Sequence, residues 1–328
     1  MVEPSSSGAE LGGLPAALPL PRLALILGGT GFIGRAIARR FLAVGVPVRI
    51  VARSGREDAI EAGTEVEFVQ GDAADPLLMQ EALRGVDRVV YAVGQSLPRE
   101  SNLKPIEDVF SALPPLLSVL EALRGVPGTG FTFLSSGGTV YGNPPVLPVP
   151  ESTACDPITG YGITKLAAEK YIGMYARLHG VNATVLRVSN AYGPGQAVGR
   201  SQGVIAALIH HALREEVASL YGNSIRDYLF VDDLAHAVVE LCRRRTPLVV
   251  NLGSGTGHSL LEVVKTVETV SGRELRLEHG PARDFDVTEI VLDVRRLNSL
   301  IHLEPRSLEQ GVRLTWSTAI EKSRAVTG

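Results

Sequence analysis

Hydrophobic runs alternate with amphipathic stretches along most of the chain. Residues 23–27 form the clearest run, and they lead through a glycine cluster into an alanine-rich stretch, 35–44, with helical spacing of its apolar positions. An uninterrupted apolar run is typical of a strand buried on both faces, and apolar residues three and four apart are typical of a helix packed on a sheet. Further strands are predicted at 46–51, 66–69, 88–93, 131–134 and 183–188.

Helical patterns separate these strands. They cover 76–85, 106–124, 161–179, 203–215, 259–272 and 306–315, and Pro114-Pro115 predicts a kink or break in the second of them. Repeated strand-helix-strand units imply a parallel sheet, so we predict an α/β protein with a Rossmann-type, doubly wound parallel sheet.

Composition narrows the possibilities for partners and location. The 328 residues are 45% hydrophobic and carry a net charge of −3, which supports a globular protein and argues against nucleic acid or a membrane as partner. Cys155 and Cys242 lie far apart without metal-ligand spacing, so we expect no metal and a reducing, cytoplasmic location. Residues 1–21 are rich in Pro, Gly, Ala and Ser, and we interpret them as a disordered tail.

The glycine cluster carries the first functional signal. Gly29, Gly31 and Gly34 match the dinucleotide fingerprint, and Gly28, Gly31 and Gly34 match its looser variant. Such glycines permit a sharp turn, close approach of a pyrophosphate and tight packing of helix on sheet, and the helix start offers free N–H groups. A tight turn without ligand is the alternative, but the strand before and the helix after favour NAD(P) binding. The expected contacts are Gly28, Gly31, Phe32, Ile33 and Gly34.

The residues after the second and third strands bear on the choice of cofactor. Arg53 and Arg56 follow the second strand, where an acid would hold the ribose hydroxyls of NAD, and an arginine there can pair with the 2′-phosphate of NADP. This favours NADP over NAD, unless both arginines are simply solvated. Asp72 follows the third strand, where it could contact adenine or cap a turn.

A tyrosine and a lysine four residues apart supply the candidate chemistry. Ser135-Ser-Gly-Gly-Thr-Val-Tyr-Gly142 follows the fifth strand, and Tyr161-Gly-Ile-Thr-Lys165 opens the next long helix. Tyr161 and Lys165 share one helix face, where the ammonium should lower the tyrosine pKa from about 10 and make it a usable base. An ordinary surface pair is the alternative, but the preceding serine-bearing strand end favours catalysis.

The order of these motifs resembles that of the extended short-chain dehydrogenase/reductases. Within them the chain is most similar to nucleotide-sugar 4-epimerases of the UDP-glucose 4-epimerase type, over nearly all of residues 22–320. The likeness rests on the glycine fingerprint, the serine segment, Tyr161-x-x-x-Lys165, Arg187-Val-Ser-Asn-Ala-Tyr-Gly-Pro-Gly-Gln196, Arg226-Asp-Tyr-Leu-Phe-Val-Asp-Asp-Leu234 and Asn251-Leu-Gly-Ser-Gly255.

This resemblance implies roles for particular residues. Tyr161 would remove the proton of the sugar 4-hydroxyl while nicotinamide takes the C4 hydride, and Lys165 would bind the nicotinamide ribose. The serine or threonine that usually assists aligns with Gly137, so Ser136, Thr139 or a water must replace it. The helix from residue 106 lacks a common asparagine and has Ser111-Ala112 there, and Tyr91-Ala-Val-Gly94 replaces a commoner His-Leu-Ala-Ala.

The resemblance also implies a cap domain and its substrate contacts. The dinucleotide domain would span 22–188, completed by about 225–255, and a smaller C-terminal α/β cap would comprise 189–224 and 256–328. Asn190, Arg226 and Arg283 would contact the sugar diphosphate, with Asp227 and Asp286 holding the two arginines. A role of Asn190 in satisfying backbone groups and a surface ion pair at Arg283 are the alternatives.

Three functions fit these observations. The first is a nucleotide-sugar 4-epimerase, which oxidises and re-reduces C4 with bound NAD(P). The second is an NADPH-dependent nucleoside-diphosphate 4-keto-sugar reductase, which Arg53 favours, and the third is a non-catalytic NAD(P)-binding protein, which Gly137 favours. The resemblance further suggests a homodimer formed through paired helices, including the helix that carries Tyr161.

Overall fold

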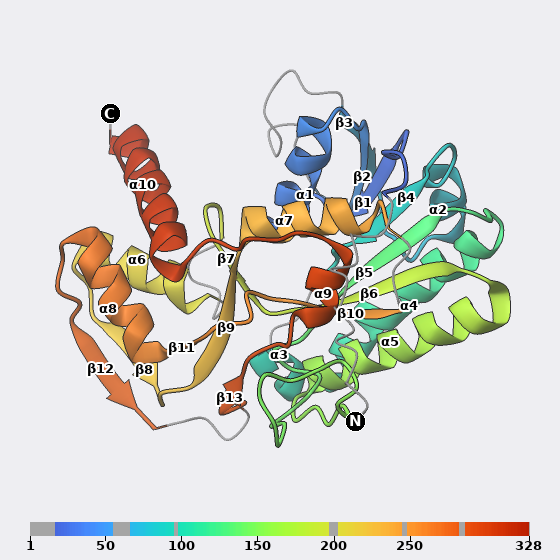
Figure 1. Cartoon of the computed structure of the whole chain (residues 1–328). Helices are drawn as coiled ribbons and strands as arrows, with labels where there is room; N and C mark the ends of the chain where they lie inside the picture. Colours follow the sequence, from blue (N-terminus) through green and yellow to red (C-terminus); the bar gives the residue numbers. More distant parts are fainter. Residues whose placement is uncertain are drawn as a thin grey trace, which may run out of the picture.

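A single parallel sheet organises the first two thirds of the chain. The structure, a computed structural model, describes residues 17–54, 66–94, 98–196, 203–244, 248–281 and 286–327. Seven parallel strands lie in the order β10-β6-β5-β4-β1-β2-β3 (Figure 1). Their bounds are β1 Ala24–Leu27, β2 Val48–Ala52, β3 Val66–Gln70, β4 Arg88–Tyr91, β5 Gly130–Ser136, β6 Asn182–Val188 and β10 Val249–Leu252.

Helices cover both faces of this sheet. The four residues of β1 are all buried, because Ala24 and Ile26 enter the core on one face while Leu25 and Leu27 enter the core on the other. The helices of the first face are α1 (Phe32–Ala43) and α7 (Val231–Leu241), and those of the second are α2 (Pro76–Ala82), α4 (Pro105–Arg124) and α5 (Gly160–His179). The Rossmann-type, doubly wound arrangement is therefore confirmed.

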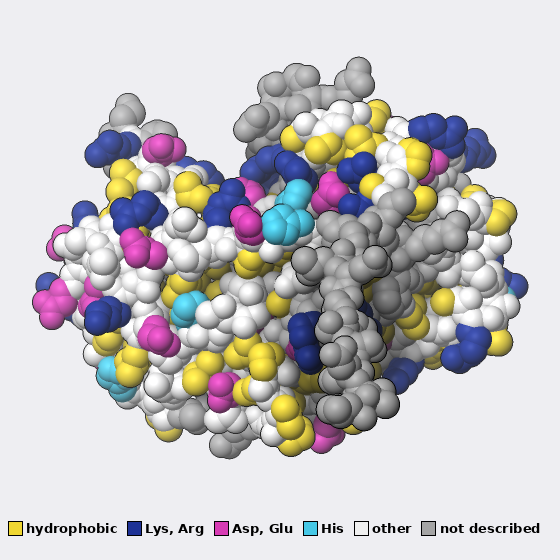
Figure 2. All heavy atoms as spheres, viewed as in Figure 1, with side chains coloured by type: hydrophobic (Ala, Val, Ile, Leu, Met, Phe, Trp, Pro, Cys, Tyr) yellow, Lys and Arg dark blue, Asp and Glu magenta, His cyan; other side chains and the backbone are white. Residues whose placement is uncertain are grey.

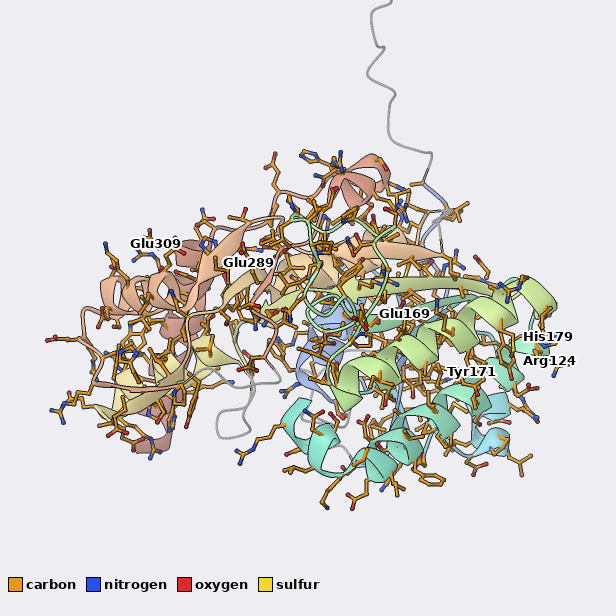
Figure 3. The ribbon with its side chains drawn as sticks, turned by 90° about the horizontal axis from the view of Figure 1, so that it is seen from below. Arg124, Glu169, Tyr171, His179, Glu289 and Glu309 are labelled. Carbon is orange, nitrogen blue, oxygen red and sulfur yellow. The ribbon has the colours of Figure 1, made fainter. Side chains whose placement is uncertain are left out.

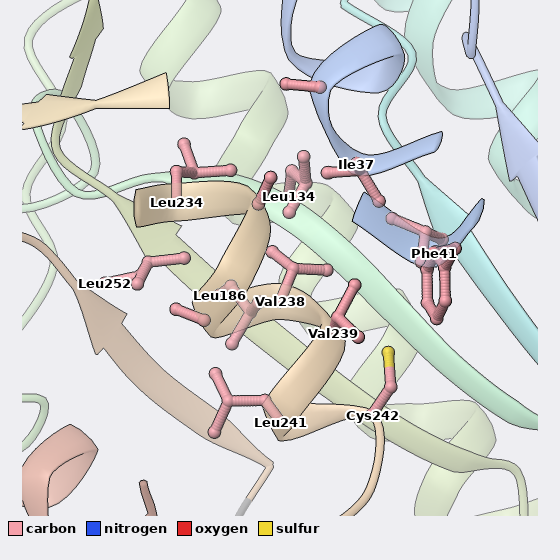
Figure 4. Close-up of a cluster of buried hydrophobic side chains, with 14 of the residues drawn as sticks. Ile37, Phe41, Leu134, Leu186, Leu234, Val238, Val239, Leu241, Cys242 and Leu252 are labelled. Carbon is pink, nitrogen blue, oxygen red and sulfur yellow. The ribbon is translucent and has the colours of Figure 1, made fainter. Parts of the chain in front are cut away.

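The packing of α7 and α1 shows how the sheet is sealed. Figure 4 shows Ile37 and Phe41 of α1 and Val238 of α7 gathered over Leu134 and Leu186 of the sheet, and all five are buried. Burying apolar surface stabilises the folded state by about 25 cal/mol per Å² removed from water. This burial is the main source of stability for the layer of helices on the sheet.

Helix α4 covers its predicted range, and only the break expected at its two prolines is absent. It runs from Pro105 to Arg124 with Pro114 and Pro115 inside it, so the helix is not broken there. A proline in a helix interior costs about 3 kcal/mol or more. The residues that follow outweigh this cost because they are buried between α4 and the sheet: Leu116, Val119, Leu120 and Leu123.

The remaining elements form a smaller body with its own core (Figure 1). Strand β9 (Ile225–Phe230) lies at the centre of a mixed sheet, and β8 (Ala218–Tyr221) pairs with β12 (Leu277–Gly280). The neighbours of β9 are β7 Asn190–Tyr192, β11 Gly257–Ser259 and β13 Glu289–Ile290, and the helices are α6 Val204–Arg214, α8 Leu260–Ser271 and α10 Leu308–Thr327. Two short helices, α3 Pro98–Leu103 and α9 Arg295–Leu300, complete the chain.

The beginning of the described chain is tied to the fold. The amide of Leu18 donates to the Arg243 carbonyl at 2.7 Å, and Arg243 Nε donates to the Leu18 carbonyl at 3.3 Å. The predicted disordered tail therefore does not include residues 17–21, because backbone groups just after α7 hold them; residues 1–16 lie outside the described chain.

The exterior carries mixed charge on the face shown in Figure 2, where basic and acidic side chains are interspersed. Within the described ranges, no helix is long and apolar enough to cross a bilayer. Cys155 and Cys242 are both free thiols.

Candidate active site

The glycine turn joins the end of β1 to the start of α1. Gly28 has a φ of +81°, and a Cβ added there would lie 2.9 Å from the Ala92 carbonyl oxygen, which follows β4. A Cβ on Gly34 would overlap the Gly28 carbonyl oxygen. Both positions therefore require glycine, one for its backbone conformation and both for close packing.

The N-terminus of α1 has free amides and could bind an anion. Gly31 is its N-cap and provides no side-chain hydrogen bond, and the first turn contains no acidic residue. The amides of Phe32 and Ile33 consequently lack a side-chain cap, while the helix dipole favours negative charge at this point. This bare N-terminus next to a turn with glycine at three of its four positions fits the pyrophosphate of a dinucleotide.

Arg53 and Asp72 lie near the ends of β2 and β3. The Arg53 side chain is exposed just beyond β2, while its carbonyl accepts a hydrogen bond from Gln70 Nε2 at 3.3 Å. Asp72 Oδ1 accepts from the Ala74 amide at 2.9 Å, which is the turn-capping role foreseen as an alternative to adenine contact. Arg56 lies outside the described residues.

Helix α5 brings Tyr161 and Lys165 to the end of β5. Its N-cap, Thr159, accepts from the Gly162 amide at 3.1 Å, and Ser101 Oγ accepts from the Tyr161 amide at 2.8 Å. Lys165 Nζ donates to the Leu134 carbonyl at 2.9 Å and lies 5.7 Å from the centre of the Tyr161 ring. Both side chains line one pocket.

The hydroxyl partner of Tyr161 could not be chosen from the sequence. In the structure the Ser136 side chain acts on the Tyr161 phenol and favours a lower pKa, whereas the Thr139 hydroxyl is buried without a hydrogen-bond partner in the described chain. A side chain at position 137 would point at Leu292, because a Cβ added to Gly137 would lie 2.7 Å from Leu292 Cδ1. A serine at 137 would clash with Leu292, and the neighbouring Ser136 makes the contact instead.

The protonation of this group differs from the sequence prediction. Burial raises the pKa of Tyr161 to about 12 and the charge of Asp108 also raises it, although the Ser136 side chain acts to lower it. The expected lowering by the ammonium is therefore wrong for this structure, because loss of solvent around the phenol is the larger effect. Burial also lowers the pKa of Lys165, to about 8, against the opposing influence of Glu169 and Asp108.

A buried ion pair beneath Lys165 was missed in the sequence. Arg187 Nη2 of β6 lies 2.7 Å from Glu169 Oε2 of α5, and both side chains are buried. Ser135 Oγ also donates to Glu169 Oε1, at 2.5 Å. Figure 3 shows Glu169 between α5 and the sheet. Tyr161, Lys165 and Glu169 are spaced four apart, so the helix period placed Glu169 on the catalytic face and could have revealed it.

The predicted substrate contacts have mixed placements. Asn190 begins β7 beside the serine segment, since a Cβ on Gly138 would lie 3.1 Å from Asn190 Oδ1. The Arg226 guanidinium donates to the carbonyls of Ile225, Thr288 and Val287, and burial lowers its pKa. Arg283 lies outside the described residues, so its pairing with Asp286 does too.

Asp227 does not hold Arg226, contrary to the prediction. Its carboxylate accepts from the amides of Ser254, Gly255 and Leu292 at 2.8, 3.1 and 3.3 Å. Alternate residues of a strand face opposite sides, so neighbouring Arg226 and Asp227 point apart on β9.

Together these features define a class of protein. A seven-stranded parallel sheet, an uncapped glycine turn after its first strand and a Ser-Tyr-Lys group after its fifth are the parts of a Rossmann-type dinucleotide-binding protein with a short-chain dehydrogenase/reductase site. The model of the NAD dependent epimerase/dehydratase family matches residues 24–253. The chain belongs to this family, which confirms the family recognised from its motifs and its NAD(P)-dependent enzyme class.

Relatives match along almost their whole length. The putative UDP-glucose 4-epimerase of Methanocaldococcus jannaschii is 30% identical over 88% of this chain and 95% of its own. The UDP-glucose 4-epimerase of Thermotoga maritima, solved with UDP-glucose, has a TM-score of 0.85 at 29% identity and covers 92% of this chain and 99% of its own. The Thermus thermophilus enzyme, solved with NAD, has a TM-score of 0.83 at 29% identity, covering 90% and 98%.

Proposed function

We propose that this protein is a nucleotide-sugar 4-epimerase that works by transient oxidation and re-reduction at C4. The observation that carries the proposal is the placement of Tyr161 and Lys165 in one pocket at the end of β5, where the Ser136 side chain acts to lower the pKa of the phenol. The similarity to UDP-glucose 4-epimerases over most of the chain supports a UDP-sugar as substrate.

In this mechanism Tyr161 exchanges the proton of the sugar 4-hydroxyl. Ser136 favours the phenolate of Tyr161 against the effect of burial, and Lys165 lies 5.7 Å from the centre of the same ring. When bound, NAD(P)⁺ would supply the acceptor for the C4 hydride and, once reduced, the donor that returns it. After proton removal, Tyr161 holds the proton that restores the hydroxyl.

The residues around the glycine turn would hold the cofactor. Phe32 and Ile33 offer the uncapped amides, and Lys165 would contact the nicotinamide ribose. We propose NADP rather than NAD, because Arg53 is exposed at the end of β2 and can meet a 2′-phosphate. The same residue is what favours the second candidate, a 4-keto-sugar reductase that consumes NADPH.

The substrate diphosphate and the oligomer complete the proposal. Asn190 would contact the diphosphate beside the serine segment, and Arg226 and Arg283 would approach it from the cap. We propose a cytoplasmic homodimer through α4 and α5, because Ile106 and Phe110 of α4 and Ile163 of α5 are large apolar side chains that are 71%, 70% and 56% exposed. Sedimentation equilibrium measures that assembly.

A panel of nucleotide sugars tests the proposed function. Purified protein is denatured to identify its cofactor by mass spectrometry, and native protein is incubated with each sugar without added reductant. We expect interconversion of a UDP-sugar with its 4-epimer. Consumption of NADPH by a 4-keto sugar, without epimerisation, would instead establish the reductase.

Tyr161→Phe separates catalysis from cofactor binding alone. We expect turnover to fall about 10²- to 10⁴-fold, because the proton-transfer group is lost while the ring remains. Tyr171→Phe is the matched control, since Tyr171 is an exposed tyrosine of the same helix. Its turnover should match the wild type. Undiminished activity of Tyr161→Phe would contradict the proposed base.

A further inference from the structure

Lys165 faces two buried carboxylates that differ in their own partners. Glu169 lies one turn further along α5 and is neutralised by Arg187 at 2.7 Å. Asp108 of α4 is only 4% exposed and lines the same pocket as Lys165 and Tyr161. In the part of the chain that the structure describes, no cation forms an ion pair with Asp108.

The Asp108 carboxylate is held in place by a hydroxyl rather than by a charge. Thr164 Oγ1, from the residue before Lys165, donates to Asp108 Oδ2 at 2.6 Å, and both residues are buried. Ser111 Oγ donates to the Asp108 carbonyl, not to its carboxylate, at 3.0 Å. A carboxylate in such a site is costly unless a positive charge lies close by, and Lys165 is the ammonium that shares its pocket.

We propose that Asp108 is a positioning residue for the reaction: its carboxylate, oriented by Thr164, is the counter-charge that keeps Lys165 protonated beside Tyr161. The proposal rests on the proposed function for its catalytic meaning, but the charge relation itself can be measured without turnover. Helix α4, which carries Asp108, would then help to set the protonation state of Lys165.

The direction of the effect follows from the groups that face Lys165. Asp108 and Glu169 raise the pKa of Lys165, and burial lowers it to about 8. Removing one raising charge should therefore move this pKa further down, by about one unit, the low end of what a nearby opposite charge contributes. The titratable groups around Lys165 are Tyr161 and Glu169 on α5, Asp108 on α4 and Tyr91 on β4, with Arg187 on β6 paired to Glu169.

Competitive acetylation of the whole protein tests the proposal. The rate at which acetic anhydride labels Lys165 is followed against pH by mass spectrometry of peptides, with exposed Lys170 of the same helix as internal reference. We compare the wild type with Asp108→Asn, which can still accept the hydrogen bond from Thr164. Glu107→Gln is the matched control, because it removes the same charge from an exposed neighbouring position on α4.

We expect the apparent pKa of Lys165 to fall by about one unit in Asp108→Asn and to stay unchanged in Glu107→Gln. The pH profile of turnover should move toward lower pH in the same variant, because Asp108 raises the pKa of Tyr161 as well as that of Lys165, and loss of packing alone would not produce this shift. Thr164→Val keeps the charge of Asp108 but removes the hydrogen bond that orients its carboxylate, so the pKa of Lys165 should fall by a smaller amount.

An unchanged Lys165 pKa in both Asp108→Asn and Thr164→Val would overturn the inference. If Asp108→Asn does not fold, Thr164→Val decides alone. Failure of the proposed function looks different: no nucleotide sugar is converted by the wild type, while the acetylation profile still shifts as described.

Discussion

The Rossmann half and the cap each bury a carboxylate, but they neutralise it in different ways. Glu169, in the Rossmann half, is paired with Arg187 and receives one hydroxyl donor. Asp227, in the cap, is 1% exposed and is surrounded by backbone amides and the Ser254 hydroxyl. One acid carries a full counter-charge, and the other depends on partial charges fixed in the backbone.

This difference separates an acid that acts on the active site from one that supports the fold. Glu169 lies one turn from Lys165 and acts to raise its pKa. Asp227 joins β9 to the segments at Ser254 and Leu292, and burial raises its own pKa despite its donors. Buried acids of similar accessibility thus differ in role because of what stands next to them.

Breaking the ion pair should have the largest effect on stability. Glu169→Gln leaves the Arg187 guanidinium buried without a counter-charge, so we expect a loss of about 3–5 kcal/mol in urea unfolding. Glu81→Gln removes a carboxylate from an exposed pair with Arg84 and should change stability by less than about 1 kcal/mol. Similar losses in the two variants would show that the buried ion pair contributes no more to the free energy of unfolding than the exposed pair does.

Removing the acid of the cap should cost somewhat less. Asp227→Ala strands the amides of Ser254, Gly255 and Leu292 without an acceptor, and we expect a loss of about 2–4 kcal/mol by the same measurement. Glu289→Ala, at an exposed position of β13, is the control and should lie within about 0.5 kcal/mol of the wild type. A near-neutral Asp227→Ala would mean that water replaces the carboxylate.

The smallest expected effect is a pH dependence that comes from Lys165. Its pKa is about 8 in the folded protein, below its ordinary value of 10.5. Below pH 8 the lysine is protonated in both the folded and the unfolded state. Above pH 8 the unfolded chain binds more protons than the folded protein does, so the contribution of Lys165 to the free energy of unfolding rises with pH. Relative to Lys165→Met, the wild type should gain roughly 1–2 kcal/mol between pH 7.5 and 9.5 in urea unfolding. A constant difference between the two proteins would contradict the lowered pKa.

Local pattern was sufficient for most of the Rossmann half. The apolar run before Gly28 predicted β1 to within one residue, and the helical spacing after Gly34 predicted α1 with a start three residues too late, because strand and helix periods are visible in a single sequence. Whether Pro114-Pro115 would interrupt α4 could not be judged from local pattern. Whether a proline breaks a helix depends on how strongly the rest of that helix is held by the core, and that packing involves β4 and β5.

The candidate site was predicted in outline and left undecided in detail. Tyr161 and Lys165 were found because their spacing places them on one helix face, a property of the chain alone. The absence of a side chain at Gly137 fits Leu292, more than 150 positions later, which occupies the space beside it, and only the folded chain shows that Ser136 rather than Thr139 acts on the phenol. Asp227 was assigned to Arg226 from adjacency in sequence, although a strand points neighbours to opposite sides.

The sequence by itself determined six of the seven strands of the main sheet and the helices between them, the glycine turn and the helix face that carries the tyrosine and lysine, because these follow from short-range periodicity and backbone sterics. Only the tertiary structure decided which hydroxyl meets Tyr161, that burial raises its pKa to about 12, and that Asp108 and Glu169 both face Lys165. Desolvation and charge proximity depend on residues brought together from distant parts of the chain, and no local pattern records them.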